Sequence, residues 1–268
     1  VCYRLWSEEQ HERLEARATP EILQSDLAPM ALQLLSWGVQ DPKELRWSQS
    51  PPEAPYGQAL GTLEQCGAAF KNNEGRFQLT PHGVRLAQMP LHPRLAHMLL
   101  VGCDIQSLET ACLLAAVLSE RNPLSSHGVD IVPALDILMG ESRCPSAFQG
   151  WFKRIWKQAR RYGRLARDVH QSRKFGVSVE GEDTLGVLIA SAYPDRIARL
   201  QSPGGVEYQL ANGRRAVLTD GDSLAGNEWI AVSDLGGKVG QPIDKIYSAV
   251  RLNPACFSEI LSPVVQQQ

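Results

Sequence analysis

The chain has 268 residues, enough for about two domains, and a formal net charge of −2, so its overall charge gives no reason to expect a nucleic-acid partner. Seven charged residues between Arg4 and Arg17 exclude the apolar core of a signal peptide there, and no stretch approaches the roughly 18 apolar residues of a membrane helix. Six scattered cysteines without C-x-x-C spacing indicate free thiols rather than a zinc site or disulfides. We therefore expect a soluble, cytoplasmic protein that binds neither membrane nor metal.

The first ninety residues predict short elements of both kinds. Residues 1–6 alternate polar and apolar side chains, which predicts one short strand that is stable only within a sheet. Helical spacing of apolar residues predicts a helix over 27–35 and a second over 58–66. Residues 70–79 form a predicted hairpin, turned at 72–75. Helices followed by a hairpin are typical of a winged-helix unit.

Two helix starts lie close together between residues 79 and 100. Thr80 can cap the first helix, with Pro81 at its first position. Met89-Pro90 ends that helix, and His92-Pro93 begins the next. This spacing predicts a rigid connection between the mixed N-terminal unit and the helices C-terminal to it.

A long helical run comes next. The segment 107–120 is apolar on nearly all sides, so it must be buried inside a bundle. The predicted helices cover 93–103, 107–120, 129–139, 146–168 and 184–192, with a loop at 176–181.

From Arg196 onward the pattern changes to that of strands. Asn212-Gly213, between two alternating runs, is a strong hairpin signal. Several short antiparallel strands predict a small barrel or sandwich. The predicted strands are 197–200, 206–210, 215–218, 229–232 and 245–252.

Motifs of catalysis are absent from the sequence. Gly236-Gly237-Lys238 is followed by Val239 and lacks the upstream glycine of a phosphate loop, and neither H-E-x-x-H nor G-x-S-x-G occurs. The six histidines fall at unrelated spacings, and we interpret His92 and His97 as structural or surface residues. We expect no catalytic residue, metal or cofactor within this chain.

One basic segment contrasts with the acidic remainder of the chain. Residues 151–174 contain nine Lys or Arg and one acid, a local charge of +8 against −10 elsewhere. Placed on a helix, the cations gather on one side and the apolar residues on the other. The cationic residues are Lys153, Lys157, Arg160, Arg161, Arg164 and Arg167.

Three interpretations of this cationic face remain open. A face exposed only to solvent normally mixes charge signs, whereas these like charges repel one another by about 0.3 kcal/mol per pair. Contact with the phosphate backbone of a nucleic acid is the interpretation we favour, and a membrane surface is the third. Weaker candidates for contact with a nucleic-acid single strand are Arg196, Arg199, Arg214 and Arg215 in the strand region, which could equally be surface residues.

Several blocks of the sequence resemble the C-terminal half of the DEAH-box/RHA-type RNA helicases, most closely the bacterial HrpB subfamily. Cys2-Tyr3-Arg4-Leu5-Trp6-Ser7-Glu8-Glu9 looks like the strand that closes the second RecA-like motor domain of that family. The remaining blocks are residues 20–22, 26–29, 79–83, 89–99, 192–199 and 210–214. Because the chain also begins with Val1 inside an apolar segment, we expect it to be a fragment.

The resemblance implies a multidomain, mainly α protein with a small β domain. Residues 1–18 would be the terminal strand and linker of the second RecA-like domain, and 19–90 a winged helix. Residues 91–194 would form the helicase-associated helical domain, often called the ratchet, and 195–268 an OB-like β-barrel. Apart from that terminal strand, the motor domains have no counterpart in this sequence, and their phosphate loop, DEAH box and arginine fingers are missing. ATP and Mg are therefore expected only in the full-length parent, an NTP-hydrolysing helicase.

In that family the ratchet and OB-like domains cover single-stranded RNA against the motor, which implies that the cationic helix holds phosphates without reading sequence. About five phosphate contacts would make the logarithm of the RNA-binding constant fall with a slope near −3.5 against the logarithm of the salt concentration.

Two other classes of function stay open: a stand-alone winged-helix nucleic-acid-binding module and a protein-interaction scaffold with an acidic partner. The absence of a basic residue from the helix predicted over 58–66 argues against the reading of duplex sequence by that unit.

Overall fold

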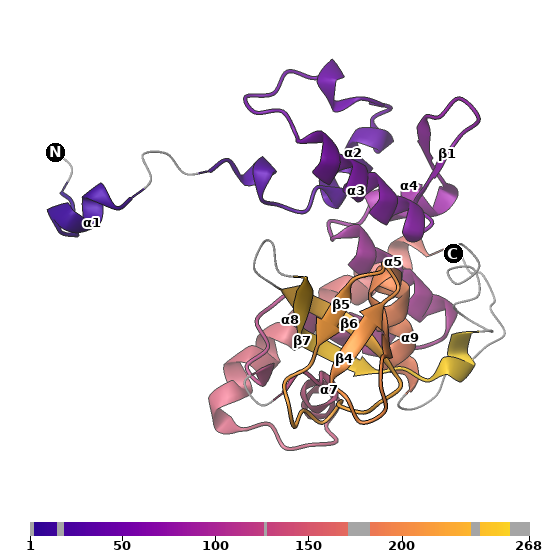
Figure 1. Ribbon diagram of the computed structural model, residues 1–268. Helices are drawn as coiled ribbons and strands as arrows, with labels where there is room; N and C mark the ends of the chain where they lie inside the picture. Colours follow the sequence, from indigo (N-terminus) through magenta and orange to yellow (C-terminus); the bar gives the residue numbers. More distant parts are fainter. Residues whose placement is uncertain (1–2, 15–18, 126–127, 171–182, 237–241, 258–268) are drawn as a thin grey trace.

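The computed structural model describes residues 3–14, 19–125, 128–170, 183–236 and 242–257. Figure 1 shows an N-terminal helical unit with a small hairpin, a helical bundle beneath it, and a barrel against one side of the bundle. None of the helices in these ranges is long and apolar enough to cross a bilayer.

Three of the four α-helices that the structure describes before residue 90 pack against a two-stranded sheet. Thr80 caps α4 as predicted, its hydroxyl accepting a hydrogen bond from the Gly83 amide at 2.9 Å. The hairpin turn at 72–75 is also confirmed. The elements are α1 (Glu8–Glu12), η1 (Glu21–Leu23), α2 (Ala28–Ser36), η2 (Pro42–Glu44), α3 (Glu53–Gln65), β1 (Ala69–Lys71), β2 (Phe77–Leu79) and α4 (Pro81–Ala87).

The bundle surrounds α6, whose middle residues are all buried, as the sequence predicts. His92 caps α5 through its side chain, which accepts from the Arg94 amide at 3.2 Å. The elements are α5 (Pro93–Asp104), α6 (Leu108–Leu118), α7 (Val132–Met139), η4 (Ser146–Phe148), α8 (Gln149–Val169) and α9 (Asp183–Ala192).

The barrel is closed, in the strand order β3-β4-β5-β7-β6. All neighbouring strands are antiparallel except β5 and β7, which are parallel. Gly213 has a φ of +84° in the turn between β4 and β5, the left-handed conformation that the Asn-Gly signal requires. The elements are η5 (Pro194–Arg196), β3 (Ile197–Leu200), β4 (Glu207–Leu210), β5 (Arg215–Val217), β6 (Trp229–Gly236), β7 (Ile243–Arg251) and η6 (Pro254–Phe257).

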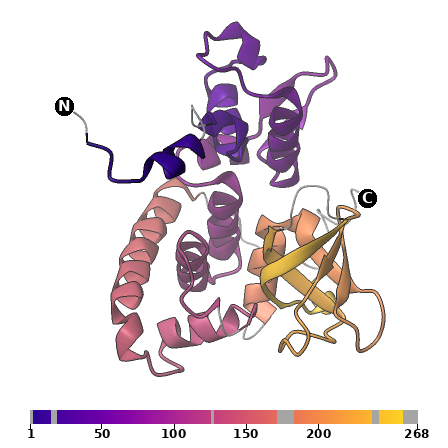
Figure 2. The ribbon, with the colours of Figure 1, turned by 60° about the vertical axis from the view of Figure 1, so that its left-hand side comes forward.

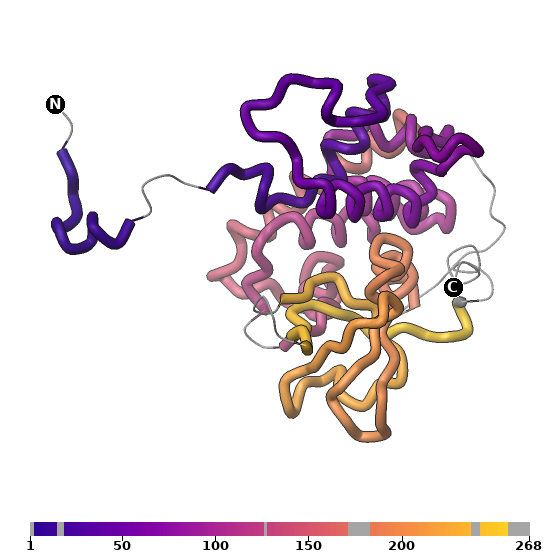
Figure 3. The backbone as a smooth tube through the Cα atoms, turned by 45° about the horizontal axis from the view of Figure 1, so that its top comes forward, coloured from indigo at the N-terminus to yellow at the C-terminus, as the bar shows by residue number. Residues whose placement is uncertain are grey.

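Two buried apolar clusters hold these parts together. The larger runs without interruption from α2 and α3 through the bundle to α9, and the smaller fills the barrel. Ile197, Ala231 and Val250 of the barrel belong to the larger cluster, so the barrel is seated on α9. The tube in Figure 3 shows the N-terminal unit above the bundle, with the barrel below and in front.

Three predicted elements differ from the structure. Residues 3–6 form no strand, because they have no neighbouring strand with which to pair, and residues 1–2 lie outside the described ranges. Helix α3 begins at Glu53, before the predicted start, since Pro55 falls in its first turn, where no amide hydrogen bond is lost. Helix α7 begins only at Val132, because the backbone at 129–131 pairs with Ala249 of β7. The loop predicted at 176–181 also lies outside the described ranges.

Candidate nucleic-acid interface

Helix α8 is long and strongly amphipathic. Its buried residues recur every three or four positions and pack against α5 and α6. They are Trp151, Ile155, Ala159, Tyr162, Gly163 and Ala166. The opposite side of the helix therefore faces solvent.

All six predicted cations of α8 lie on that solvent side. Each is exposed, and none of them forms an ion pair with a carboxylate in the ranges that the structure describes. Arg154, a seventh cation on α8, differs because its Nε lies 3.3 Å from Oε2 of Glu120. We call the six residues Lys153, Lys157, Arg160, Arg161, Arg164 and Arg167 the cationic face.

The four predicted arginines of the barrel have different surroundings. Arg196 donates to the Ser233 carbonyl at 2.7 Å and lies over the Tyr193 ring. Arg214 donates to Oδ1 of the buried Asp244 at 2.6 Å. Their guanidinium groups are thus occupied by the protein itself.

The guanidinium groups of Arg199 and Arg215 are more accessible to a ligand. Arg199 is exposed, lies 3.5 Å from Glu228 and covers the Trp229 ring. Arg215 is exposed on β5. These two could meet a ligand with less rearrangement than Arg196 or Arg214.

The structure does not bring the two predicted groups of cations together. In Figure 2, α8 lies on one side of α5 and α6, whereas the barrel lies on the other. Helix α8 packs on α5 and α6, and the barrel packs on α9. The cationic face and the barrel arginines are therefore separate surfaces.

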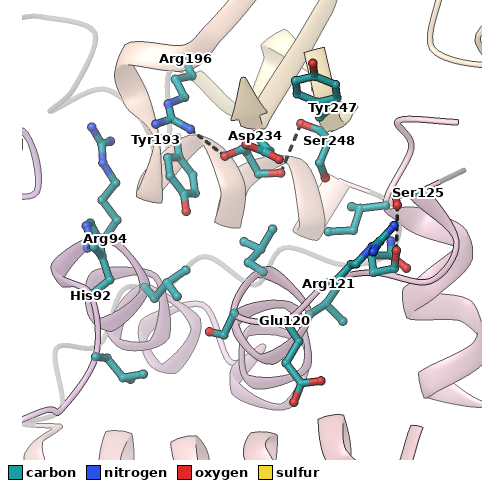
Figure 4. A pocket seen from close by; sticks show the side chains of 18 of the residues that line it. His92, Arg94, Glu120, Arg121, Ser125, Tyr193, Arg196, Asp234, Tyr247 and Ser248 are labelled. Carbon is teal, nitrogen blue, oxygen red and sulfur yellow. Dashed lines mark hydrogen bonds between the residues drawn. The ribbon is translucent and has the colours of Figure 1, made fainter. Parts of the chain in front are cut away.

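A polar pocket of about 840 Å³ lies where the start of α5, the end of α6 and the barrel meet (Figure 4). Its walls carry both signs of charge: Arg94, Arg121 and Arg196 against Asp26, Glu120 and Asp234. A phosphate entering it would meet as many carboxylates as cations. The cationic face is thus the better electrostatic match for a polyanion.

Arg94 is the key residue of this region that sequence reasoning missed. Its guanidinium, 6 % exposed, donates to the Ala192 carbonyl at 2.9 Å and to Oδ1 of Asp195 at 2.6 Å. It also reaches Thr62 of α3 at 3.4 Å. One buried side chain therefore ties α3, α5 and the α9–β3 connection together.

A signal for this contact was present in the sequence. Residues 89–99 and 192–199 are two of the blocks that carry the family resemblance, and they meet through Arg94 and Asp195. The separation of the two residues, 101 positions, hides the pair from any local pattern. Their joint occurrence indicates a structural role for both blocks.

Three of the histidines in the described ranges contact other side chains of the protein. His92 lies 3.1 Å from Asp26, and this hydrogen bond lowers the pKa of Asp26 to about 2. Nε2 of His82 in α4 lies 2.8 Å from Nδ1 of His97 in α5. Burial lowers the pKa of His97 to about 4.

Three thiols in the described ranges are poor nucleophiles because they are buried. Burial raises the pKa of Cys66 and Cys112 to about 12 and that of Cys103 to about 11, which keeps these groups protonated near neutral pH. Cys66, Cys103, Cys112 and Cys144 are not in disulfides. Those ranges also contain no group of three or more metal-binding side chains.

No protein-family model matches the chain, but individual proteins do. The ATP-dependent RNA helicase HrpB of Escherichia coli strain K12 is 32 % identical over 230 residues, which cover 86 % of this chain. A crystal structure of E. coli HrpB, described as a DExH-box NTPase, matches with a TM-score of 0.70 and 28 % identity over 97 % of the chain. The chain is a homologue of HrpB.

Other relatives match a shorter part of the chain. The probable ATP-dependent RNA helicase DHX35 of Homo sapiens is 36 % identical over 118 residues, or 42 % of this chain. E. coli HrpA is 30 % identical over 124 residues, or 46 % of the chain. The chain covers 25 % of the length of HrpB and 16 % of that of DHX35, so it corresponds to a limited portion of these helicases.

Proposed function

We propose that this chain is an accessory region of an HrpB-type ATP-dependent RNA helicase and that it holds single-stranded RNA by its backbone. Support comes from the homology to HrpB and from the names of the relatives, which are RNA helicases. ATP binding with Mg, and hydrolysis, would belong to RecA-like motor domains of the parent protein in the cytoplasm. The sequence of this chain has no phosphate loop for that chemistry.

The same proposal assigns the parts of the chain. Residues 1–18 would be the end of the second motor domain, 19–90 a winged helix, 91–194 the ratchet and 195–268 an OB-like domain. The helices with a hairpin, the bundle around α6 and the closed five-stranded barrel are compatible with this division. The continuous core between the N-terminal unit and the bundle would make the winged helix and the ratchet move as one.

The observation that carries RNA binding is the unpaired cationic face. Six exposed Lys and Arg on one side of α8 repel one another, and no carboxylate within the described ranges forms an ion pair with any of them. A phosphate backbone would relieve it, because each contact releases counterions and contributes to affinity. The face runs from Lys153 to Arg167, about 21 Å along the helix, which gives it room for several phosphates.

Charge reversal tests the proposal directly. We expect Arg160→Glu, Arg161→Glu and Arg164→Glu together to weaken strongly the binding of poly-U RNA in a filter-binding assay at low salt. All three side chains are exposed, so the fold should be unaffected. A matched control reverses Arg46, Lys71 and Arg76, three exposed cations of the N-terminal unit, and should keep most of the affinity.

Two outcomes would contradict the proposal. Equal loss in both triple variants would indicate that only total charge matters. Absence of binding by the wild-type chain at low salt would instead favour a protein-interaction scaffold with an acidic partner.

A further inference from the structure

Beside the cationic face lies a shallow groove of about 540 Å³ between the end of α7 and the middle of α8. Its apolar surface comes from Met139, Phe152 and Trp156, and its rim from Lys153, Lys157 and Arg164. Four of the six residues of the cationic face line this groove, because Arg160 also contributes. We propose that the groove is a stacking site for an unpaired RNA base whose phosphates contact the cationic face; this inference rests on the proposed function.

The two aromatic rings are placed for contact with a ligand. Phe152 and Trp156 are one helical turn apart on α8, with ring centroids 6.5 Å apart, and both side chains are only partly buried. The indole N–H of Trp156 donates to the Leu138 carbonyl at 3.2 Å, which fixes the ring against α7. A fixed aromatic surface loses little conformational freedom when a base stacks on it.

The end of α7 keeps the groove open. Gly140 ends this helix with a φ of +88°, a left-handed conformation that glycine adopts without steric cost. Met139, just before it, leaves 43 % of its surface exposed. An exposed methionine beside two aromatic rings is an apolar surface that the protein itself does not cover.

The charges around the groove favour a nucleotide over an apolar ligand. The guanidinium of Arg160 lies over the Trp156 ring, 5.8 Å from its centroid, so a base that stacks on this face would take the place of a cation that stays close by. A base on the ring would bring its own phosphate within reach of such a cation. Stacking together with phosphate contact is how single strands are bound without sequence readout. An acidic helical peptide would satisfy the rim charges, but it would make no specific use of the two rings.

Binding of matched strands with and without bases tests this inference. We would titrate the 268-residue chain with oligoadenylate and with an abasic ribose-phosphate strand of the same length. The wild-type chain should prefer the base-containing strand by about tenfold. Phe152→Leu with Trp156→Leu should remove the preference and leave the salt dependence, because leucine keeps the apolar character without an aromatic face.

Two further variants serve as controls, one for misfolding and one for the loss of an exposed aromatic side chain elsewhere on the protein. Phe152→Leu alone keeps the Trp156 hydrogen bond and should cause a smaller loss of preference in the same direction. Trp37→Leu removes a tryptophan that is 70 % exposed on the N-terminal unit and should change nothing.

The outcomes separate this inference from the proposed function. If the wild-type chain binds neither strand, the proposed function and the inference both fail. If both strands bind equally with a steep salt dependence, phosphate contact stands and the stacking site is wrong. Persistence of the preference in the double variant also contradicts the site.

Discussion

Arg94 and the arginines of α8 carry the same guanidinium group in opposite surroundings. Arg94 is buried and donates its hydrogen bonds to Asp195, to the Ala192 carbonyl and to Thr62. Arg160, Arg161 and Arg164 are exposed and form no ion pair with a carboxylate in the described part of the chain. An arginine that the protein satisfies internally holds the fold, whereas one left without a carboxylate partner is available to a ligand.

The largest expected effect concerns the buried arginine. We expect Arg94→Ala to lower the free energy of unfolding by about 3–5 kcal/mol, because Oδ1 of the largely buried Asp195 loses its donor and only Arg196, 4.0 Å from Oδ2, remains beside the carboxylate. Arg164→Ala, on the exposed face, should change stability by less than about 0.5 kcal/mol. Chemical denaturation of both variants measures the difference. Equal stability of the two variants would contradict the conclusion that the buried arginine stabilises the fold and the exposed one does not.

Arg214 is an intermediate case that sharpens the comparison. Its own side chain is 63 % exposed, but its partner Asp244 is only 6 % exposed. We expect Arg214→Ala to cost about 1–3 kcal/mol, since a buried carboxylate oxygen loses its donor. Arg215→Ala, at the neighbouring exposed position, is the matched control and should be nearly neutral. A neutral result for Arg214→Ala would mean that exposure of the arginine alone decides its role.

Acid should weaken the connection between α4 and α5 without changing the charge of the cationic face. The pKa of His97 is about 4 in the folded protein against 6.5 for an ordinary histidine, so the unfolded chain binds the extra proton first as the pH falls. This residue therefore lowers the free energy of unfolding from about pH 6.5 towards pH 4, by at most about 1.4 kcal/mol per unit. Urea denaturation at several pH values measures the slope. His97→Leu should flatten it, and an unchanged slope in that variant would assign the acid sensitivity to other groups.

Local signals in the sequence predicted much of this fold. Thr80-Pro81, His92-Pro93 and Asn212-Gly213 each determine a helix start or a turn through neighbouring atoms, and the structure places all three as expected. The amphipathic pattern of α8 likewise follows from the helical repeat alone, so its exposed cations could be identified from the sequence.

Long-range contacts account for what the sequence did not reveal. The start of α7 is displaced because the backbone at 129–131 pairs with β7, far along the chain. The Arg94–Asp195 pair joins positions 101 residues apart. The groove at Phe152 and Trp156 also depends on where α7 ends in space, which the pattern of α8 cannot indicate.

The salt dependence of RNA binding tests the central claim most directly. For the wild-type chain we predict a slope of log K against log salt near −3.5, equivalent to about a hundredfold loss of affinity between 50 and 200 mM salt. In the variant with Arg160, Arg161 and Arg164 reversed to Glu, the slope should be abolished. An unchanged affinity and slope in that variant would contradict the assignment of RNA contact to the cationic face of α8.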